Sequence, residues 1–538
     1  MERFAAPLNQ APTPHRRHPM AHAVQAIAGM AASALAIHAM AAPGAAACNA
    51  MKNLVIPNAT ITGATYTTSP AGSYCQVSAT VAPEHDLQVV LPDNWKSRYL
   101  QTGGAGFDGN VPDAGALAAG GAFAASGNNL VAGGYVVTAD NGGHRGAAHP
   151  GASFAVDRGL TLSYASGKIF DTHLVATALM LKYYGQPARY NYFSGCSNGG
   201  KNASVAAANY PDWFDAIVGG DGVWGQARDH AGGSDMAGLT SKWAQTVQLG
   251  AITQAQGDAL HAAVVKACDG LDGVKDGIVS NVEACNIPAV VQGMRCGAGA
   301  SGACLTDADI GKVMGYIRPL TLNNRVVGAP WSGAANLAGI VGPSFGLGSG
   351  FLEMAFRTPT PVDPASYDIA HQFADVAAVL DGVYGMTGDL GGIVRYLQRG
   401  KKLVLFHGWE DQLVPSYVSV DFFRALARAD DDAARNSRLY MDPGVGHCSG
   451  GNGADSMDLL TVATKWVEQG VEPGSYRNPV EAWKRGGGSS PADIGGAAFT
   501  RPLCPYPSYA HYVGRGDVDS AANYACRPAP WRRGDDAD

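Results

Sequence analysis

Apolar residues along the chain follow two different periodicities. Four apolar runs have the length of a β-strand and lead into loops with glycine or proline: 86–91, 98–101, 134–138 and 190–193. Residues 171–184 instead place apolar side chains three and four positions apart, which predicts a helix that ends at Gly185. A second helical stretch follows the last run and reaches Asn209. Strands that alternate with helices predict a mostly parallel sheet in an α/β fold.

The middle of the chain departs from this alternation. Between about residues 223 and 398 the sequence is glycine-rich and irregular and holds four cysteines, and the alternation resumes at 402–406. We therefore expect residues 223–398 to form an inserted lid domain. Residues 48–222 and 399–538 would then be the two parts of one α/β domain.

The composition is that of a large folded protein with a small-molecule partner. The 538 residues are 46% hydrophobic and 15% charged, which is enough for more than one small core. The net charge is −7, and basic residues adjoin only in short pairs such as 16–17 and 532–533. This pattern argues against nucleic acid and against anionic membrane surfaces as partners. The sequence does not determine the oligomeric state.

Residues 1–47 are typical of an export signal. Basic residues at 16–18 precede an alanine-rich apolar run from 23 to 40, and Ala45–Ala47 offers an A-x-A cleavage site. The mature chain would start near Cys48 and be secreted or periplasmic. A membrane anchor and a lipid-anchored Cys48 are the alternatives, and no second apolar span of about 20 residues follows.

All ten cysteines lie in the predicted mature part, and their even number fits complete pairing in an oxidising compartment. Ten cysteines allow about 945 pairings. Short loops favour four of the disulfides: Cys48–Cys75, Cys268–Cys285, Cys296–Cys304 and Cys504–Cys526. Cys196 and Cys448 remain as the fifth pair.

The sequence matches G-x-S-x-G twice, around Ser197 and around Ser344. The first match follows a strand-like run and opens a helical stretch, which is the setting that a nucleophile elbow requires. The second match follows a glycine-rich loop and lacks this setting. We therefore expect Ser197 to be a nucleophile, with a plain glycine turn as the alternative.

A serine nucleophile needs a base, and the base needs a carboxylate that holds its tautomer. Asp411 lies in the loop after a predicted strand, and His447 lies in a turn-rich loop after the next one. The order Ser197, Asp411, His447 is the order of the α/β-hydrolase triad. Glu410 and Asp442 are rival candidates for the acid.

Three motifs together resemble the tannase/feruloyl esterase family. They are Gly-Cys-Ser-x-Gly-Gly from 195, His-Gly-x-x-Asp from 407 and Pro-Gly-x-Gly-His-Cys from 443. The resemblance spans nearly the whole predicted mature chain and implies an α/β-hydrolase fold with a large inserted lid. It also implies a Cys196–Cys448 disulfide that holds the histidine loop over the nucleophile elbow. The implied activity is hydrolysis of aromatic-acid esters, of feruloyl or galloyl type, through an acyl-enzyme.

Acyl transfer also needs donors for the oxyanion, and the backbone N–H of Asn198 is the expected first donor. The second is expected in the glycine loop at 103–106, where the family pattern favours Gly106. A flexible loop is the alternative.

The acidic, glycine-rich segment 268–280 suits calcium, which prefers oxygen ligands. Its spacing differs from the EF-hand pattern, so that an ordinary acidic loop is the alternative. The family resemblance implies a structural ion that braces the lid, apart from the ester chemistry. The implied ligands are the carboxylates of Asp269, Asp272 and Asp276 and the backbone carbonyls of Val274 and Ile278.

Other functions remain open at this stage. Hydrolysis of a terephthalate half-ester is a narrower version of the same activity, and a peptidase or lipase would use the same fold. A secreted, calcium-stabilised binding protein without catalysis belongs to another class. Four aromatic residues of the lid either line an aromatic acyl pocket or form the lid's own core: Trp331, Phe345, Phe351 and Phe356.

Overall fold

The computed structural model describes residues 43–118, 129–225, 235–297, 302–474, 480–484 and 498–529. Most of the predicted export signal, up to residue 42, lies outside the described residues. Its last residues begin the helix α1 (Ala45–Ala50). Cys48 is buried and bonded to Cys75, so the alternative of a lipid-anchored Cys48 is wrong, because its sulfur is not free.

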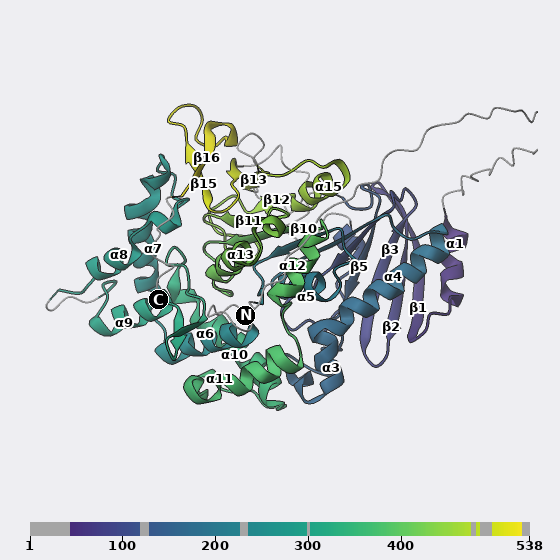
Figure 1. Ribbon diagram of the computed structural model, residues 1–538, viewed down its shortest axis with the longest axis horizontal. Helices are drawn as coiled ribbons and strands as arrows, with labels where there is room; N and C mark the ends of the chain where they lie inside the picture. Colours follow the sequence, from purple (N-terminus) through teal and green to yellow (C-terminus); the bar gives the residue numbers. More distant parts are fainter. Residues whose placement is uncertain are drawn as a thin grey trace, which may run out of the picture. The chain divides into compact units, whose positions relative to one another are not determined.

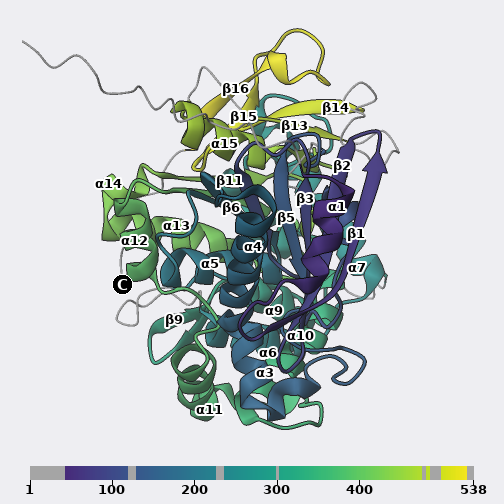
Figure 2. The same ribbon diagram turned by 90° about the vertical axis from the view of Figure 1, so that its right-hand side faces the viewer.

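A nine-stranded mixed sheet forms the centre of the fold, in the order β1-β2-β3-β5-β4-β6-β7-β10-β11 (Figure 1, Figure 2). The strands are β1 (Ala59–Ser69), β2 (Gly72–Val81), β3 (His85–Pro92), β4 (Arg98–Thr102), β5 (Tyr135–Asp140), β6 (Tyr190–Cys196), β7 (Ala216–Gly220), β10 (Lys402–Gly408) and β11 (Ser437–Asp442). Strands β1, β2, β3 and β5 pair antiparallel, and every pair from β5 to β11 is parallel. Each predicted strand is present, whereas β1, β2 and β7 were not predicted.

Helices cover both faces of this sheet. One face carries α4 (Lys168–Tyr184), α5 (Asn198–Asn209), α12 (Leu390–Gln398) and α13 (Tyr417–Ala429), and the other carries α2 (Ala114–Ala118) and α15 (Leu459–Gln469). The predicted helix α4 ends as expected at Gly185, with φ 76°. Along β10, Leu403 and Leu405 join the first core while Val404 and Phe406 join the second. Burial on both faces explains why the inner strands are continuous apolar runs.

The segment between β7 and β10 is mostly helical, although its glycine-rich sequence does not show the alternation of strands and helices seen before and after it. It holds α6 (Met236–Leu249), α7 (Gln254–Cys268), α8 (Ile287–Gly293), α9 (Asp307–Tyr316), α10 (Val341–Phe356), α11 (Ile369–Ala377) and the hairpin β8 (Leu320–Leu322) and β9 (Arg325–Gly328). These elements share a hydrophobic core with α3 (Arg158–Leu162). In Figure 1, α8 and α9 lie on the left and β1 and β2 on the right. The domain limits at 222 and 398 stay predictions.

Glycine inside a helix makes the helical content of this segment hard to predict from the sequence. Gly350 lies within α10, where a Cβ would come 2.3 Å from the ring of Phe107. The missing side chain therefore serves close packing against the first part of the chain and does not mark a loop.

The chain ends in short strands that lie together at the top of Figure 1. A three-stranded sheet contains β12 (Ser456–Met457), β13 (Val480–Lys484) and β14 (Phe499–Leu503), and a hairpin contains β15 (Ser508–Tyr512) and β16 (Tyr524–Pro528). A short helix, α14 (Asp431–Ala434), precedes β11. Within the described ranges, no helix combines the length and the apolar character needed to cross a membrane.

Candidate active site

Three of the predicted site residues follow parallel strands of the central sheet. Ser197 follows β6, Asp411 lies beyond β10, and His447 lies beyond β11. Because β6, β7, β10 and β11 run parallel, their carboxyl ends meet at one edge of the sheet. Functional residues of open α/β sheets gather at this edge.

Ser197 occupies a sharp turn between a strand and a helix. Its φ is 63° and its ψ is −122°, between the end of β6 and the start of α5. A Cβ on Gly195 would lie 2.7 Å from the backbone of Gly199, so the turn requires glycine there. Such a left-handed serine is strained and is retained where function needs it. Ser344, in the second G-x-S-x-G match, is instead buried inside the helix α10.

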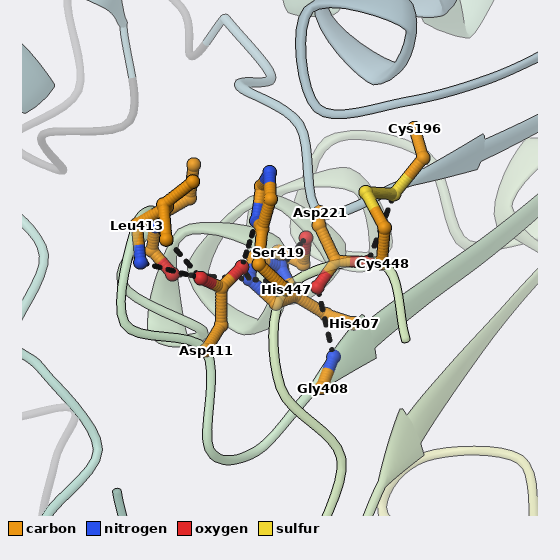
Figure 3. Close-up of a disulfide and its surroundings, with 10 residues drawn as sticks. Cys196, Asp221, His407, Gly408, Asp411, Leu413, Ser419, His447 and Cys448 are labelled. Atoms are coloured by element: carbon orange, nitrogen blue, oxygen red, sulfur yellow. Dashed lines mark hydrogen bonds and ion pairs between the residues drawn. A yellow bond between two sulfur atoms is a disulfide. The ribbon is translucent and has the colours of Figure 1, made fainter. Parts of the chain in front are cut away.

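Asp411 and His447 are in direct contact (Figure 3). His447 Nδ1 donates a hydrogen bond of 2.7 Å to Asp411 Oδ2. The other oxygen, Oδ1, accepts the backbone N–H groups of Leu413 at 2.7 Å and Val414 at 3.0 Å. His447 Nε2 is buried and has no hydrogen-bond partner among the described residues. This nitrogen can therefore exchange a proton with a group that enters the site.

The rival acids make no such contact. Both carboxylate oxygens of Asp442 are buried and have no hydrogen-bond partner within the described ranges. Burial and the nearby charge of Asp221 raise the pKa of Asp442 well above its usual value. Burial also raises the pKa of Glu410. Asp411 is thus the carboxylate that is paired with the imidazole.

The Asp411–His447 pair changes the ionisation of both groups. Burial alone would lower the pKa of His447, but the charge and the hydrogen bond of Asp411 outweigh it and raise the pKa to about 9. Burial alone would raise the pKa of Asp411, yet His447 and His407 lower it well below its usual range. The acid thus stays ionised and can stabilise an imidazolium.

A second histidine, His407, lies behind this pair and was not predicted. Its Nε2 lies 3.2 Å from Asp411 Oδ2, 3.2 Å from the carbonyl oxygen of Val414 and 3.6 Å from Asp221 Oδ1. Because only oxygen acceptors surround Nε2 in these contacts, this nitrogen carries a proton. Its Nδ1 lies 2.8 Å from Ser419 Oγ (Figure 3). His407 is the first residue of the motif from 407, but its contact with Asp221, which is far away in the sequence, could not be predicted from that motif.

A disulfide joins the neighbours of the serine and the histidine. Cys196 and Cys448 are bonded with a Cα–Cα distance of 6.0 Å, across 252 residues of sequence. This pairing was predicted and is confirmed. The four short-loop pairings are confirmed as well: Cys48–Cys75, Cys268–Cys285, Cys296–Cys304 and Cys504–Cys526.

The glycine loop predicted to bind an oxyanion lies against the turn of Ser197. A Cβ on Gly103 would come 2.5 Å from Cα of Gly199. Gly106 has a φ of 54°, and its carbonyl oxygen accepts a hydrogen bond of 3.0 Å from the hydroxyl of Tyr164. Asn198 opens α5, where the first backbone N–H groups have no partner within the helix. The two predicted donors, Gly106 and Asn198, thus lie in two segments that contact each other through Gly103 and Gly199.

The four lid aromatics lie in different surroundings. Trp331 is buried in the lid core and donates from Nε1 to Thr246 Oγ1 at 2.9 Å. Phe345 and Phe356 are 46% and 40% exposed. Phe351 packs on Phe107, the residue after Gly106, with ring centres 5.4 Å apart. Phe351 is thus in contact with the residue that follows the glycine loop.

The acidic loop after α7 is folded by hydrogen bonds among its own residues. Asp269 accepts the backbone N–H groups of Asp276 and Gly277 at 3.2 Å, and Asp272 accepts that of Val274 at 3.2 Å. Arg501 of β14 donates to the carboxylate of Asp276 at 2.6 Å, which ties the loop to the end of the chain.

Asp272 is the residue of this loop that best fits a cation. It is 0% exposed, and its Oδ2 has no hydrogen-bond partner among the described residues. Burial, together with the like charges of Asp276 and Asp269, raises the pKa of Asp272 to about 6. A buried oxygen of this kind gains from a bound cation. In the described ranges the three carboxylates do not converge as one ligand group, and Arg501 pairs with one oxygen of Asp276, its Oδ2.

Comparison with known proteins defines the class of this chain. A mixed sheet with helices on both faces and a serine in a sharp strand-to-helix turn is the architecture of an α/β-hydrolase, which confirms the predicted fold. The family model "Tannase and feruloyl esterase" matches residues 69–328 and 348–527. The chain therefore belongs to the tannase and feruloyl esterase family and is a carboxylic ester hydrolase.

Individual relatives agree with this assignment. The chain is 27% identical over 553 residues to mono(2-hydroxyethyl) terephthalate hydrolase of Piscinibacter sakaiensis, covering 87% of each chain. It is 31% identical over 466 residues to a probable feruloyl esterase of Arthroderma benhamiae, covering 81% of each. The crystal structure of an esterase from Aspergillus oryzae shares the fold, with a TM-score of 0.76 at 20% identity over 90% of this chain and 99% of that one.

Proposed function

We propose that this chain is an exported serine esterase that cleaves esters of aromatic acids, with Ser197 as nucleophile, His447 as base and Asp411 as the acid of a triad. The observation that carries the proposal is the 2.7 Å hydrogen bond from His447 Nδ1 to Asp411 Oδ2, which leaves Nε2 without a partner in the described part of the chain. The Cys196–Cys448 disulfide supports it, because it ties the histidine loop to the turn of Ser197.

The reaction proceeds in two acyl transfers. Ser197 Oγ attacks the ester carbonyl while His447 Nε2 takes the hydroxyl proton. Asp411 holds the proton on Nδ1 and stabilises the imidazolium, which then gives its Nε2 proton to the leaving alkoxide. Water, activated by the same nitrogen, hydrolyses the acyl-enzyme and restores the serine.

Backbone donors stabilise the tetrahedral intermediate. The N–H groups of Asn198 and Gly106 would bind the oxyanion, and the contact between Gly103 and Gly199 supports this pairing of segments. One such donor is worth about 10²- to 10³-fold in kcat in comparable enzymes.

An aromatic acyl group fits the surroundings of this site. Phe107 follows Gly106 and packs on Phe351, which itself stacks on Trp243 with ring centres 5.8 Å apart. These rings bring apolar lid surface beside the proposed oxyanion site. The names of two relatives, a feruloyl esterase and a terephthalate half-ester hydrolase, point to aromatic acids as well. Terephthalate half-ester hydrolysis is the second candidate, favoured by the similarity to the Piscinibacter enzyme over 87% of the chain.

A structural calcium ion is part of the proposal. The carboxylates of Asp269, Asp272 and Asp276 and the carbonyls of Val274 and Ile278 would hold it, and the unpartnered buried oxygen of Asp272 supports this assignment. The ion would supply positive charge among these acids and brace the loop closed by Cys268–Cys285. It would take no part in the acyl transfer.

Five disulfides support export into an oxidising compartment. The partner is a small-molecule ester. A secreted binding protein without catalysis is the competing class, and the Asp411–His447 pair speaks against it.

Hydrolysis of an ester panel by three forms of the protein tests the proposal. The panel holds methyl ferulate, a gallate ester, the terephthalate half-ester and a butyrate ester, offered to the wild type, Ser197→Ala and Ser344→Ala. Ser344 shares the G-x-S-x-G pattern but is buried in α10, so it is the matched control. We expect turnover of an aromatic ester that Ser197→Ala abolishes and Ser344→Ala preserves.

A serine-directed phosphonate separates the two classes independently of substrate choice. If the chain is a serine esterase, the phosphonate should label the wild type at Ser197. If it is a binding protein without catalysis, the wild type should stay unlabelled. Faster turnover of butyrate than of every aromatic ester would contradict the aromatic specificity while keeping the triad.

A further inference from the structure

We propose that Asp108 is a positioning residue that joins the two halves of the oxyanion site, and that Lys168 balances its charge. This inference rests on the proposed function, since it concerns the backbone donors of Asn198 and Gly106. It assigns a task to a buried ion pair that the triad does not use.

The carboxylate of Asp108 contacts both segments that would bind the oxyanion. Its Oδ1 accepts the backbone N–H of Ala105 at 2.6 Å, within the glycine loop. Its Oδ2 accepts a hydrogen bond of 3.1 Å from Nδ2 of Asn198, the residue after the nucleophile. One rigid carboxylate thus fixes the spacing between the loop before Gly106 and the start of α5.

The surrounding backbone is shaped to hold this carboxylate. A Cβ on Gly104 or on Gly142 would come 2.1 Å from atoms of the Asp108 side chain. Both glycines therefore leave room that the carboxylate fills, and the side chain of Asp108 is only 3% exposed. Asp108 itself has a φ of 53°, a conformation that aspartate tolerates better than most residues.

A second contact holds Gly106 itself. The hydroxyl of Tyr164 donates to the carbonyl oxygen of Gly106 at 3.0 Å. Tyr164 lies in a π-helical turn, Ser163–Gly167, directly before Lys168 at the start of α4. Single π-helical turns are rare and occur often at functional sites. The π-helical turn thus contains Tyr164, which holds Gly106, and leads directly into Lys168, which holds Asp108.

The charges explain why Lys168 is needed. A lone carboxylate beside an oxyanion would oppose the negative charge that develops in the transition state. Lys168 Nζ is hydrogen-bonded to Asp108 Oδ2, with its side chain 2% exposed, and lies 3.9 Å from Asp140 Oδ1. The buried amine of Lys201 lies 4.4 Å from the ring centre of Tyr164. Lys168 thus supplies a positive charge beside Asp108 and Asp140.

The test replaces Asp108 by asparagine, with Asp215→Asn as the matched control. Asp215 likewise accepts a backbone N–H, from Asn191 at 2.9 Å, and a lysine Nζ, from Lys401 at 2.8 Å, but it lies before β7. We expect Asp108→Asn to lower kcat about 10- to 100-fold, because small misplacements of a reacting geometry cost about 10²-fold. KM should stay within about twofold, and Asp215→Asn should keep the wild-type kcat.

Inhibitor binding distinguishes positioning from general damage. An aryl boronic acid forms a tetrahedral adduct with serine that uses the oxyanion site, whereas the free aromatic acid product does not require it. Asp108→Asn should weaken boronate binding by the same factor as kcat/KM and leave product binding unchanged. Asn198→Ala removes only the side-chain link and keeps the backbone donor, so it provides a second variant if Asp108→Asn does not fold. It should lower kcat and boronate affinity together.

Two results would overturn the inference. If the folded variants keep the wild-type kcat and the wild-type boronate affinity, the carboxylate of Asp108 does not position the oxyanion donors. Equal losses of boronate and product affinity would assign Asp108 a purely structural role. Full activity of Ser197→Ala would instead refute the proposed function itself, so that the two failures are distinguishable.

Discussion

Replacing both Cys196 and Cys448 by alanine should destabilise the fold and impair catalysis at the same time. The two sulfurs close a loop of 252 residues. In the chain-entropy model a loop of this length stabilises the fold by roughly 5–6 kcal/mol through the unfolded state, as an upper value. The same model gives roughly 2.5 kcal/mol for Cys296–Cys304, which spans 8 residues in the lid.

The catalytic effect follows from what the disulfide joins. It connects the residue before Ser197 to the residue after His447, so its loss frees the base relative to the nucleophile. A shift of about 1 Å in such a pair costs about 10²-fold in rate. We expect kcat to fall at least about tenfold in the Cys196→Ala/Cys448→Ala protein and to stay unchanged in the Cys296→Ala/Cys304→Ala control.

The assay has two parts. Denaturant unfolding, monitored by tryptophan fluorescence, gives the stability of each variant. The kcat on an aromatic ester is measured at a temperature well below the melting temperatures of both variants. A kcat equal to that of the wild type in the Cys196→Ala/Cys448→Ala protein would refute the idea that the disulfide holds the base in place. A larger loss of stability in the lid control would refute the loop-length reasoning.

Three further predictions concern charge. Asp411 raises the pKa of His447 to about 9, and only the neutral imidazole is a base, so kcat/KM should increase with pH between about 6.5 and 9. In Asp411→Asn the midpoint of this pH profile should move down while kcat drops about 10⁴-fold. A kcat/KM that falls with pH over this range would contradict the assignment. Removal of calcium by a chelator should lower the melting temperature without an immediate loss of Ser197 phosphonate labelling. Asp272→Asn should abolish this change in melting temperature, which calorimetry with and without the ion can measure. Burial raises the folded-state pKa of Asp442, so this buried group costs stability as pH rises above its unfolded value near 4. Asp442→Leu should therefore stabilise the fold more at pH 7 than at pH 4, as measured by denaturant unfolding. An equal effect at both pH values would show that ionisation is not involved.

Local patterns in the sequence were sufficient for much of the fold and for part of the site. The strands around β6 and β10, the helix that ends at Gly185 and the turn at Ser197 each depend on residues adjacent in the chain. Loop length together with elimination was sufficient for the five disulfides. The family motifs led to the family assignment, whereas the catalytic roles, the oxyanion donors, the export signal and the calcium ligands stay predictions.

Tertiary structure decided what depends on residues far apart in the chain. The helices of the lid were not predicted, because glycine is a weak helix former, although Gly350 serves helix packing. The choice of Asp411 over its rivals required the position of His447, and the contact of His407 with Asp221 joins residues far apart in the chain. The sequence of a short segment fixes its own periodicity and turns, but which buried groups meet is fixed only when the strands that carry them are brought side by side.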